Sequence, residues 1–190
     1  PSNVTPVWAL AKQAGVDHAV GGLPTPEDCR PGERPVDLEP LRRMKQRYED
    51  AGFTLSVIEA RPPYNLIKRG LPGRDEELEG VCTMIENMGK LGIPVWCPEW
   101  MTDYNWLRTH TDTPSRGGSV VTSYDHATME ARGVSENGPI SEEKLWETLA
   151  WFLQRVVPVA ERAGVKSVPA LVLAGQAYHI SFGAPLSALK

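Results

Sequence analysis

The feature that most constrains this fold is a repeating unit: a short apolar run, a polar loop and an amphipathic segment. Residues 53–58 form an apolar run rich in β-branched side chains, and residues 93–97 form the next one. Between them, residues 75–91 carry apolar side chains at helical spacing, with Asp75 expected to cap the first turn and Gly92 to end the helix. Buried strands joined by helical crossovers are typical of a parallel sheet. The sequence therefore predicts an α/β fold.

Further copies of this unit are expected on both sides. Residues 5–15 and 37–52 each combine apolar side chains at helical spacing with a closing glycine, and residues 17–20 between them suit a short strand. The clearest helix spans residues 141–164, opening with a serine cap and two glutamates. Pro158 is expected to kink this helix near its end, because proline lacks the backbone N–H.

Both an open doubly wound sheet and a β/α barrel fit this alternation. Long connections after the expected strands, residues 24–36 and 98–139, favour the barrel, whose active sites are built from such loops. The 190 residues are fewer than the roughly 250 of a complete eightfold barrel, so an incomplete (β/α)8 TIM barrel is predicted. No glycine fingerprint for a dinucleotide or phosphate is present, since Pro72 removes an N–H from the loop at 70–73.

Composition and charge narrow the class of protein. Hydrophobic residues make up 41% and charged residues 23%, as in an ordinary globular protein. The formal charge of -4 favours neither nucleic acid nor an anionic membrane, and no apolar run reaches the ~20 residues of a membrane helix. Cys29, Cys82 and Cys97 are odd in number and lack metal-ligand spacing, which suits a reducing cytoplasm. Because Pro1 is not methionine, the start is expected to be trimmed.

Three stretches of the chain stand out as motifs. They are IKRGLPGRDEE (67–77), NWLRT (105–109) with RGG (116–118), and ISEE (140–143) leading into VPVAERAGVK (157–166). In this order they resemble the loop-to-helix signature, the next long loop and the following helix of the mannonate dehydratase family. The resemblance runs from about the first helix to Lys166, and the combination is specific.

The resemblance implies a β/α barrel of the xylose-isomerase-like kind. It implies a lyase that removes water from D-mannonate to give 2-keto-3-deoxy-D-gluconate during hexuronate breakdown, with a divalent metal, commonly manganese. Removing a proton next to a carboxylate develops negative charge, which a metal and cationic side chains can stabilise. A small sugar acid is the expected partner, with no nucleic acid or membrane, a cytoplasmic location, and either a homo-oligomer or a complementing chain.

The sequence departs from the family after Lys166. A His-Pro-Asp-Asp-Pro motif is expected there, but residues 167–176 read SVPALVLAGQ. The metal ligands of the family, a cysteine, histidines and an aspartate, come from later strands, so no metal ligand is assigned here. The opening strand is also expected to be missing before Pro1. Residues 1–166 are thus expected to be the first half of the barrel and 167–190 an unmatched tail, a pattern that a reading-frame shift near the codon for Lys166 would produce.

This truncation leaves three functional interpretations open. The first is a mannonate dehydratase-like enzyme that is inactive as this chain alone. The second is a non-catalytic barrel fragment that needs a complementing chain, because an incomplete barrel leaves open sheet edges. The third is a related sugar isomerase or epimerase, which the loop signatures do not support.

Four residues are predicted to bind the substrate. Arg108 could clamp the carboxylate of an acidic sugar with its bidentate guanidinium, or form a surface salt bridge. The neighbouring Trp106 could form a wall of the pocket or anchor its loop. Glu59 ends a buried strand, where barrel enzymes place their functional groups, but could simply reach solvent or pair with Arg61. His18, at another strand end, is the one histidine worth testing, although a structural role is commoner.

Glu99 has the same position on the next strand as Glu59 has on its own. A paired carboxylate site from these two residues on adjacent strands is conceivable. The sequence does not set the distance between them.

Overall fold

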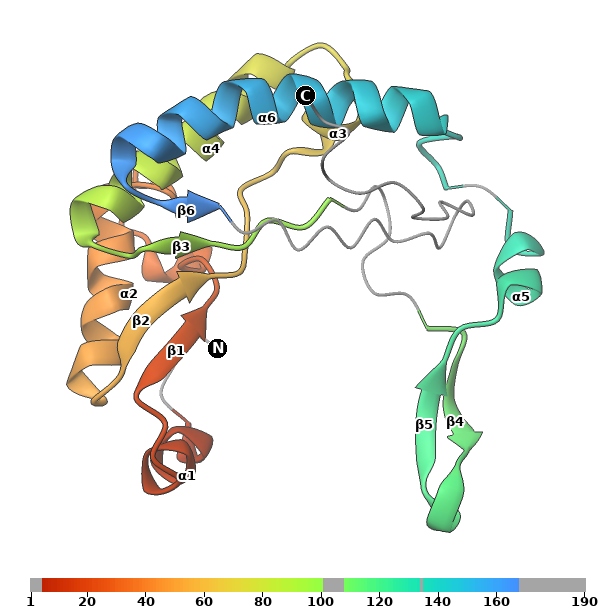
Figure 1. Cartoon of the computed structure of the whole chain (residues 1–190), viewed down its shortest axis with the longest axis horizontal. Coiled ribbons are helices and arrows are strands. Elements are labelled where there is room, and N and C mark those ends of the chain that lie inside the picture. Colours follow the sequence, from red (N-terminus) through yellow and green to blue (C-terminus); the bar gives the residue numbers. More distant parts are fainter. Residues whose placement is uncertain (1–4, 101–107, 134, 168–190) are drawn as a thin grey trace.

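The protein is described by a computed structural model that covers residues 5–100, 108–133 and 135–167. Four parallel strands form one sheet in the order β1-β2-β3-β6, and two antiparallel strands form a separate hairpin (Figure 1). The sheet strands are β1 (His18–Gly21), β2 (Thr54–Ile58), β3 (Val95–Trp96) and β6 (Lys166–Ser167). Helix α1 (Pro6–Gln13) precedes β1, and the long helices between successive strands are α2 (Leu38–Asp50), α4 (Arg74–Leu91) and α6 (Glu142–Ala163). The predicted incomplete β/α barrel is therefore confirmed.

The strands pair in the order in which they occur in the sequence. His18 is opposite Thr54 in the first pair, and Val95 is opposite Lys166 in the last. β3 is shorter than the predicted strand at 93–97, since Pro94 cannot contribute an N–H to the ladder. Because all four strands are parallel, the loops that follow them emerge at the same edge of the sheet.

The predicted long helices are confirmed, with one correction at an N-terminus. Ser141 caps α6 by accepting a hydrogen bond from the Lys144 amide at 3.2 Å, and the helix continues through Pro158 to Ala163. Asp75 was expected to cap α4, and this is wrong. The cap is Gly73, at φ 90°, without a side-chain hydrogen bond. The positive φ there suits glycine, so the helix begins one residue before Asp75.

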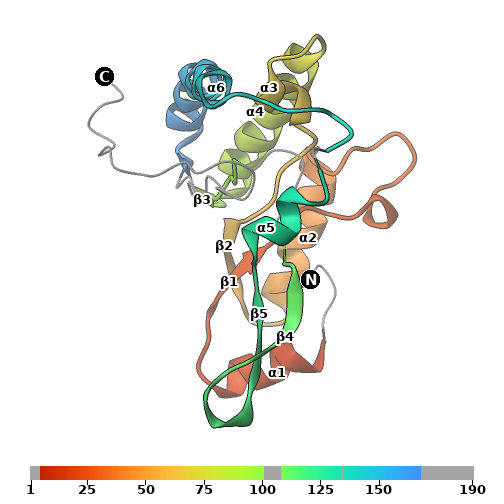
Figure 2. The same cartoon turned by 90° about the vertical axis from the view of Figure 1, so that its right-hand side faces the viewer.

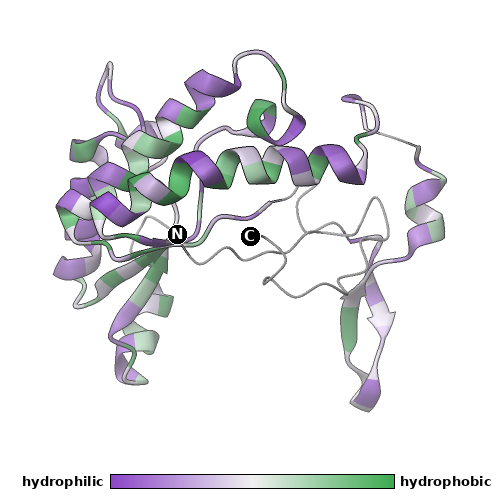
Figure 3. Ribbon diagram, turned by 45° about the horizontal axis from the view of Figure 1, so that its top comes forward, coloured by the Kyte–Doolittle hydropathy of each residue, from purple (hydrophilic) through white to green (hydrophobic). Residues whose placement is uncertain are grey.

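The core lies between the sheet and its helices. Its largest fully buried side chains include Trp96 of the sheet, Met84, Ile85 and Met88 of α4, and Phe152 of α6. Apolar and polar patches alternate along these helices, as an amphipathic helix that covers a sheet requires (Figure 3). Gly89 lets α4 approach the end of α6, because a Cβ there would lie 2.4 Å from the Ala163 carbonyl oxygen.

Several short elements were not predicted from the sequence. The helix α3 (Asn65–Arg69) overlaps the start of the signature at 67–77, and its C-cap is Gly70 in the left-handed region. The hairpin strands β4 (His110–Pro114) and β5 (Val120–Ser123) and the helix α5 (His126–Glu130) lie in the connection at 98–139. Two 3-10 turns, η1 (Pro26–Asp28) and η2 (Arg116–Gly118), complete the elements. Figures 1 and 2 both show the hairpin extending away from α4 and α6.

Within the described ranges, no helix is both long enough and apolar enough to cross a membrane.

Candidate functional site

The candidate site lies where β2 and β3 end. The segment after β2 begins at Glu59, and the segment after β3 reaches Glu99 and Trp100. Arg61 forms an ion pair with Glu99, which joins the two segments side by side. A second tie comes from Trp96, whose indole Nε1 donates to the Ala60 carbonyl at 2.9 Å. These contacts fix the carboxyl ends of two neighbouring strands, the place where a β/α barrel builds its site.

An aromatic cluster lies beside this ion pair. The Trp100 ring centroid is 5.8 Å from that of Tyr64 and 5.2 Å from that of Phe152, so α6 contributes to the same group. Lys68, on α3, is only 1% exposed, and its Nζ lies 4.5 Å from the Tyr64 ring centroid. The guanidinium carbon of Arg61 lies 5.0 Å from that same centroid. Two cations therefore meet one aromatic ring, an arrangement stabilised by the ring's quadrupole.

Two polar atoms of this cluster have no hydrogen-bond partner in the part of the chain that the structure describes: Tyr64 Oη and Trp100 Nε1. Burial raises the pKa of Tyr64, although the nearby Arg61 acts in the opposite direction, so the phenol stays protonated near neutral pH. An unsatisfied buried polar group costs about 1–3 kcal/mol. Both donors thus mark a place where an acceptor oxygen of water or a ligand would be stabilising.

The two predicted carboxylates have different surroundings. Glu99 lies against Arg61, with 16% of its side chain exposed, whereas Glu59 directly follows β2 and is exposed. Arg61 is therefore the partner of Glu99. The alternative that Arg61 pairs with Glu59 is not what the described residues show. Glu59 keeps the strand-end position expected of a substrate-binding group, and its role stays a prediction.

His18 lies at the opposite end of its strand. It is the first residue of β1, so it lies at the amino end of the sheet, whereas Glu59 follows the carboxyl end of β2. Its Nδ1 lies 2.6 Å from the Ser56 hydroxyl oxygen, within hydrogen-bond distance. The structure does not bring His18 together with the strand-end group of Arg61, Tyr64 and Lys68, and a β/α barrel builds its site at the other end of its strands.

Arg108 lies at the base of the hairpin and is exposed. Its Nε donates to the Thr122 hydroxyl of β5 at 3.2 Å. Figure 1 shows the hairpin apart from the parallel sheet, so the structure does not group Arg108 with Glu59. Trp106 lies outside the described residues. The carboxylate clamp by Arg108 stays a prediction.

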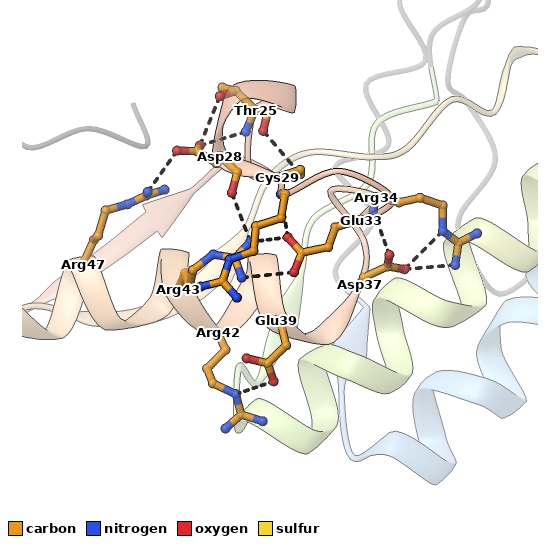
Figure 4. Close-up of polar contacts among 11 residues, drawn as sticks. Thr25, Asp28, Cys29, Glu33, Arg34, Asp37, Glu39, Arg42, Arg43 and Arg47 are labelled. Atoms are coloured by element: carbon orange, nitrogen blue, oxygen red, sulfur yellow. Dashed lines mark hydrogen bonds and ion pairs between the residues drawn. The ribbon is translucent and has the colours of Figure 1, made fainter.

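Hydrogen bonds and ion pairs hold the loop after β1 on α2 (Figure 4). Asp28 pairs with Arg47 at 2.9 Å, and Glu33 pairs with Arg43. The hydrogen bonds from Arg43 and from the Arg30 amide hold the pKa of Glu33 below its ordinary value. Burial alone would raise the pKa of Asp28, but hydrogen bonds from the Thr25 amide and from Arg47 lower it overall. Charged contacts therefore determine the position of this loop.

A cavity of about 550 Å³ lies between this loop, the segment after β2 and the start of α4. Prolines form much of its wall, and two of its charged residues are already paired: Arg34 with Asp37, and Arg61 with Glu99. The Glu77 carboxylate accepts a hydrogen bond from the Ile67 amide at 3.0 Å. A polyhydroxylated acid needs several polar contacts, so the strand-end group is the better candidate for it.

The described residues do not fit a metal ion. No three histidine, cysteine, aspartate or glutamate side chains converge anywhere within residues 5–100, 108–133 and 135–167. Hard divalent cations are held by several such groups, so no step of the chemistry is assigned here to a metal.

Sequence reasoning missed Arg61, Tyr64 and Lys68. The start of the signature IKRG was interpreted as a loop, and because lysine is almost never fully buried, the burial of Lys68 was not predicted. The available signal was periodicity, because Tyr64, Ile67 and Lys68 are spaced as one face of a helical turn.

The comparisons with known proteins point to one family. Residues 8–137 match the sequence profile of a family described as D-mannonate dehydratase (UxuA). The mannonate dehydratase of Streptococcus pneumoniae (strain 70585) is 35% identical over 190 residues, covering 87% of this chain and 50% of the relative. That of Thermotoga petrophila is 32% identical over 183 residues, covering 80% and 50%.

A solved structure supports the same assignment. The crystal structure of mannonate dehydratase from Streptococcus suis serotype2 superimposes with a TM-score of 0.72 and 29% sequence identity, covering 88% of this chain and 50% of that one. The chain thus spans about half the length of the relatives it matches. With the signature on α3 and α4 and the parallel half-barrel in place, the chain belongs to the mannonate dehydratase family.

Proposed function

We propose that this chain contributes the first half of the barrel to a mannonate dehydratase-type lyase acting on a six-carbon sugar acid. The family match over residues 8–137 carries the proposal, because it includes the strand-end group of Arg61, Tyr64 and Lys68. A cytoplasmic location and a place in hexuronate breakdown belong to the same proposal. So does dependence on a divalent metal such as manganese, for which no described residue is assigned.

The proposed reaction is an elimination of water. A base removes the proton from the carbon next to the carboxylate, and the hydroxyl on the following carbon takes up a proton, the one from the base or an equivalent one, as its C–O bond breaks and it leaves as water. The enol that forms then rearranges to the 2-keto acid, so atoms and charge balance. Negative charge grows on the carboxylate side of the substrate during proton removal, and fixed cations nearby lower the barrier. The buried Lys68 supplies positive potential near the strand ends, and Arg108 is the proposed bidentate contact to the carboxylate.

The proposal is tested with D-mannonate and manganese added to the purified chain. We expect binding of the sugar acid, measured by isothermal titration calorimetry, without formation of 2-keto-3-deoxygluconate. Replacing Arg108 by alanine should weaken binding by about tenfold, the cost typical of a lost charged hydrogen bond. Clear turnover by this chain alone would overturn the view that essential groups lie elsewhere. An unchanged affinity for R108A would remove Arg108 from the site.

A complementing chain is our second proposal, favoured by the open edges of the sheet. β1 pairs only with β2, and β6 only with β3, among the described strands. A closed barrel leaves no strand with an unpaired edge, and unpaired edges attract other strands. In this proposal, the remaining strands of the barrel come from another polypeptide.

This second proposal is tested by mixing. The carboxyl-terminal half of the Streptococcus suis relative, produced separately, is added to this chain with manganese and mannonate. Turnover in the mixture, absent from either part, is the expected result. Two parts that neither associate nor turn over substrate would exclude complementation by that partner.

A further inference from the structure

The long connection between β3 and α6, residues 98–139, is held at both of its ends by one short segment, residues 59–70. We propose that this segment acts as a clasp, and that Arg69 is a positioning residue for the connection and for Arg108 within it. The role of Arg108 in sugar-acid binding rests on the proposed function, whereas the clasp itself does not.

The first end of the connection is held by Arg61. This residue pairs with Glu99, and both side chains are mostly buried, at 23% and 16% exposure. Trp100 follows at once and packs on Tyr64, which belongs to the same short segment. A partly buried ion pair beside an aromatic contact restricts the backbone more than an exposed pair would.

The second end of the connection is held by Arg69. Its Nη2 donates to the carbonyl oxygens of Asn137 at 2.6 Å, Gly138 at 3.1 Å and Pro139 at 3.5 Å. These three residues are the last of the connection, just before the Ser141 cap of α6. Hydrogen bonds from a charged donor are roughly twice as strong as those between neutral groups.

Arg69 can hold the connection because its own helix is fixed. The Thr148 hydroxyl of α6 donates to the Lys68 carbonyl at 2.8 Å in a buried hydrogen bond. Gly70, at φ 66°, brings the chain so close to α6 that a Cβ would lie 2.9 Å from Lys144 Cε and 3.1 Å from Thr148 Cγ2. The Arg69 guanidinium therefore extends from a helix, α3, that is itself held against α6.

In the clasp, the four residues of the signature IKRG have different roles. Ile67 and Lys68 are buried, Arg69 reaches the connection, and Gly70 permits the close approach to α6. Residues 59–70 thus hold the two points between which the hairpin and Arg108 extend. The hairpin itself makes no such contact at its tip, where the side chains of residues 115–120 are exposed.

Hydrogen exchange of the whole chain, without sugar acid, tests the clasp. Three variants are compared with wild type: Arg69→Met, which keeps the aliphatic stem; Arg69→Lys, which keeps the charge; and Arg42→Met. Arg42 is a matched control, an exposed arginine paired with Glu39 inside α2. We expect R69M to raise exchange in residues 108–133 and 135–141 about tenfold, with R69K within about twofold of wild type and R42M unchanged.

Exchange is read relative to α2 in the same molecule. A variant that loosens the whole protein raises exchange in both regions, and such a parallel rise in R69M overturns the proposal. Equal rates in R69M and wild type also overturn it. Loss of protection in R69K equal to that in R69M would show that shape, not charge, matters at this position, which contradicts the carbonyl contacts as the cause.

The positioning role is tested by mannonate binding to the same variants. R69M should bind about tenfold more weakly than wild type and R42M equally well. No binding by wild type would overturn the proposed function while leaving the exchange result to decide on the clasp. Wild-type affinity in an R69M variant with raised exchange would overturn the positioning role.

Discussion

The parallel sheet and the β4–β5 hairpin belong to the same chain, but different interactions stabilise them. In the first region, Leu55, Ile58 and Trp96 are at most 1% exposed, and burial against helices stabilises the pairing. In the hairpin, Val120 is 62% and Val121 46% exposed. Hydrogen bonds and a turn hold it together, including one of 2.6 Å between the Thr113 and Ser123 hydroxyls. An isolated two-stranded hairpin is marginally stable.

Because of this difference, we expect the same kind of substitution to change the free energy of unfolding by different amounts in the two regions. Removing buried volume should damage the sheet region severely, whereas substitutions in the hairpin should hardly affect the free energy of unfolding. The loop on α2 lies between these extremes, because charged contacts and not burial hold it.

The largest effect is expected for Phe152→Ala. The side chain is 2% exposed and contacts Trp96, Trp100 and Tyr64, so its loss leaves a cavity in the packed region. The free energy of unfolding should fall by about 3–5 kcal/mol, measured by urea denaturation. Val157→Ala, at a 40% exposed position of the same helix, should change it by no more than about 0.5 kcal/mol. Equal losses would show that α6 is not packed through Phe152.

A smaller loss is expected for Gly89→Ala. A Cβ there would lie 2.4 Å from the backbone carbonyl of Ala163, so α4 and α6 must move apart, at a cost of about 1–3 kcal/mol. The control is Gly80→Ala on the same helix, where the nearest atom is Pro62 Cβ at 4.0 Å. That variant should be neutral or more stable by up to about 1 kcal/mol, owing to helix propensity. Thermal unfolding of both variants checks the contrast; a stable G89A would refute the close packing of these helices.

The loop on α2 should loosen in acid. The pKa values of Asp28 and Glu33 are lowered in the folded protein from ordinary values of 3.8 and 4.5. A lowered pKa means that the unfolded state binds protons first, so the stabilisation is complete above these ordinary values and is lost as the pH falls through the folded ones. Hydrogen exchange in residues 22–37 should therefore rise relative to α4 as the pH is lowered from about 5 to about 3, the range in which carboxyl groups ordinarily titrate. A flat ratio would mean that these ion pairs do not hold the loop.

The smallest effect is expected in the hairpin. Val120→Thr and Val121→Thr keep β-branching and replace an exposed methyl group, so each should change the free energy of unfolding by less than about 0.5 kcal/mol. Leu55→Ala in β2 is the paired measurement, expected to lose about 2–5 kcal/mol. A loss above about 1 kcal/mol in either hairpin variant would show that these valines are buried against a partner in solution.

The sheet region could be predicted from the sequence because burial leaves a periodic pattern. Residues 37–52 and 141–164 carried that pattern and formed α2 and α6, with the expected serine cap. The hairpin left no such pattern, since both faces of its strands are solvent-exposed and alternation has no physical cause there.

The site could be predicted only in part, because its contacts join distant segments. Glu59 and Glu99 were correctly placed after neighbouring strands, yet the choice of Arg61 as the partner of Glu99 depends on side-chain directions that spacing does not reveal. His18 was placed at a strand end without knowing which end. The distinction required the exact strand boundary, which local sequence determines poorly.

The strand order also bears on how the fold can form. β1 and β2, like β2 and β3, pair across similar sequence separations, whereas β3 and β6 pair across roughly twice that distance because residues 98–139 intervene. Each doubling of a flexible loop adds only about 0.6 kcal/mol of closure entropy. The barrel can therefore carry a long insertion between two neighbouring strands at little thermodynamic cost, while the last pairing forms more slowly than the local ones.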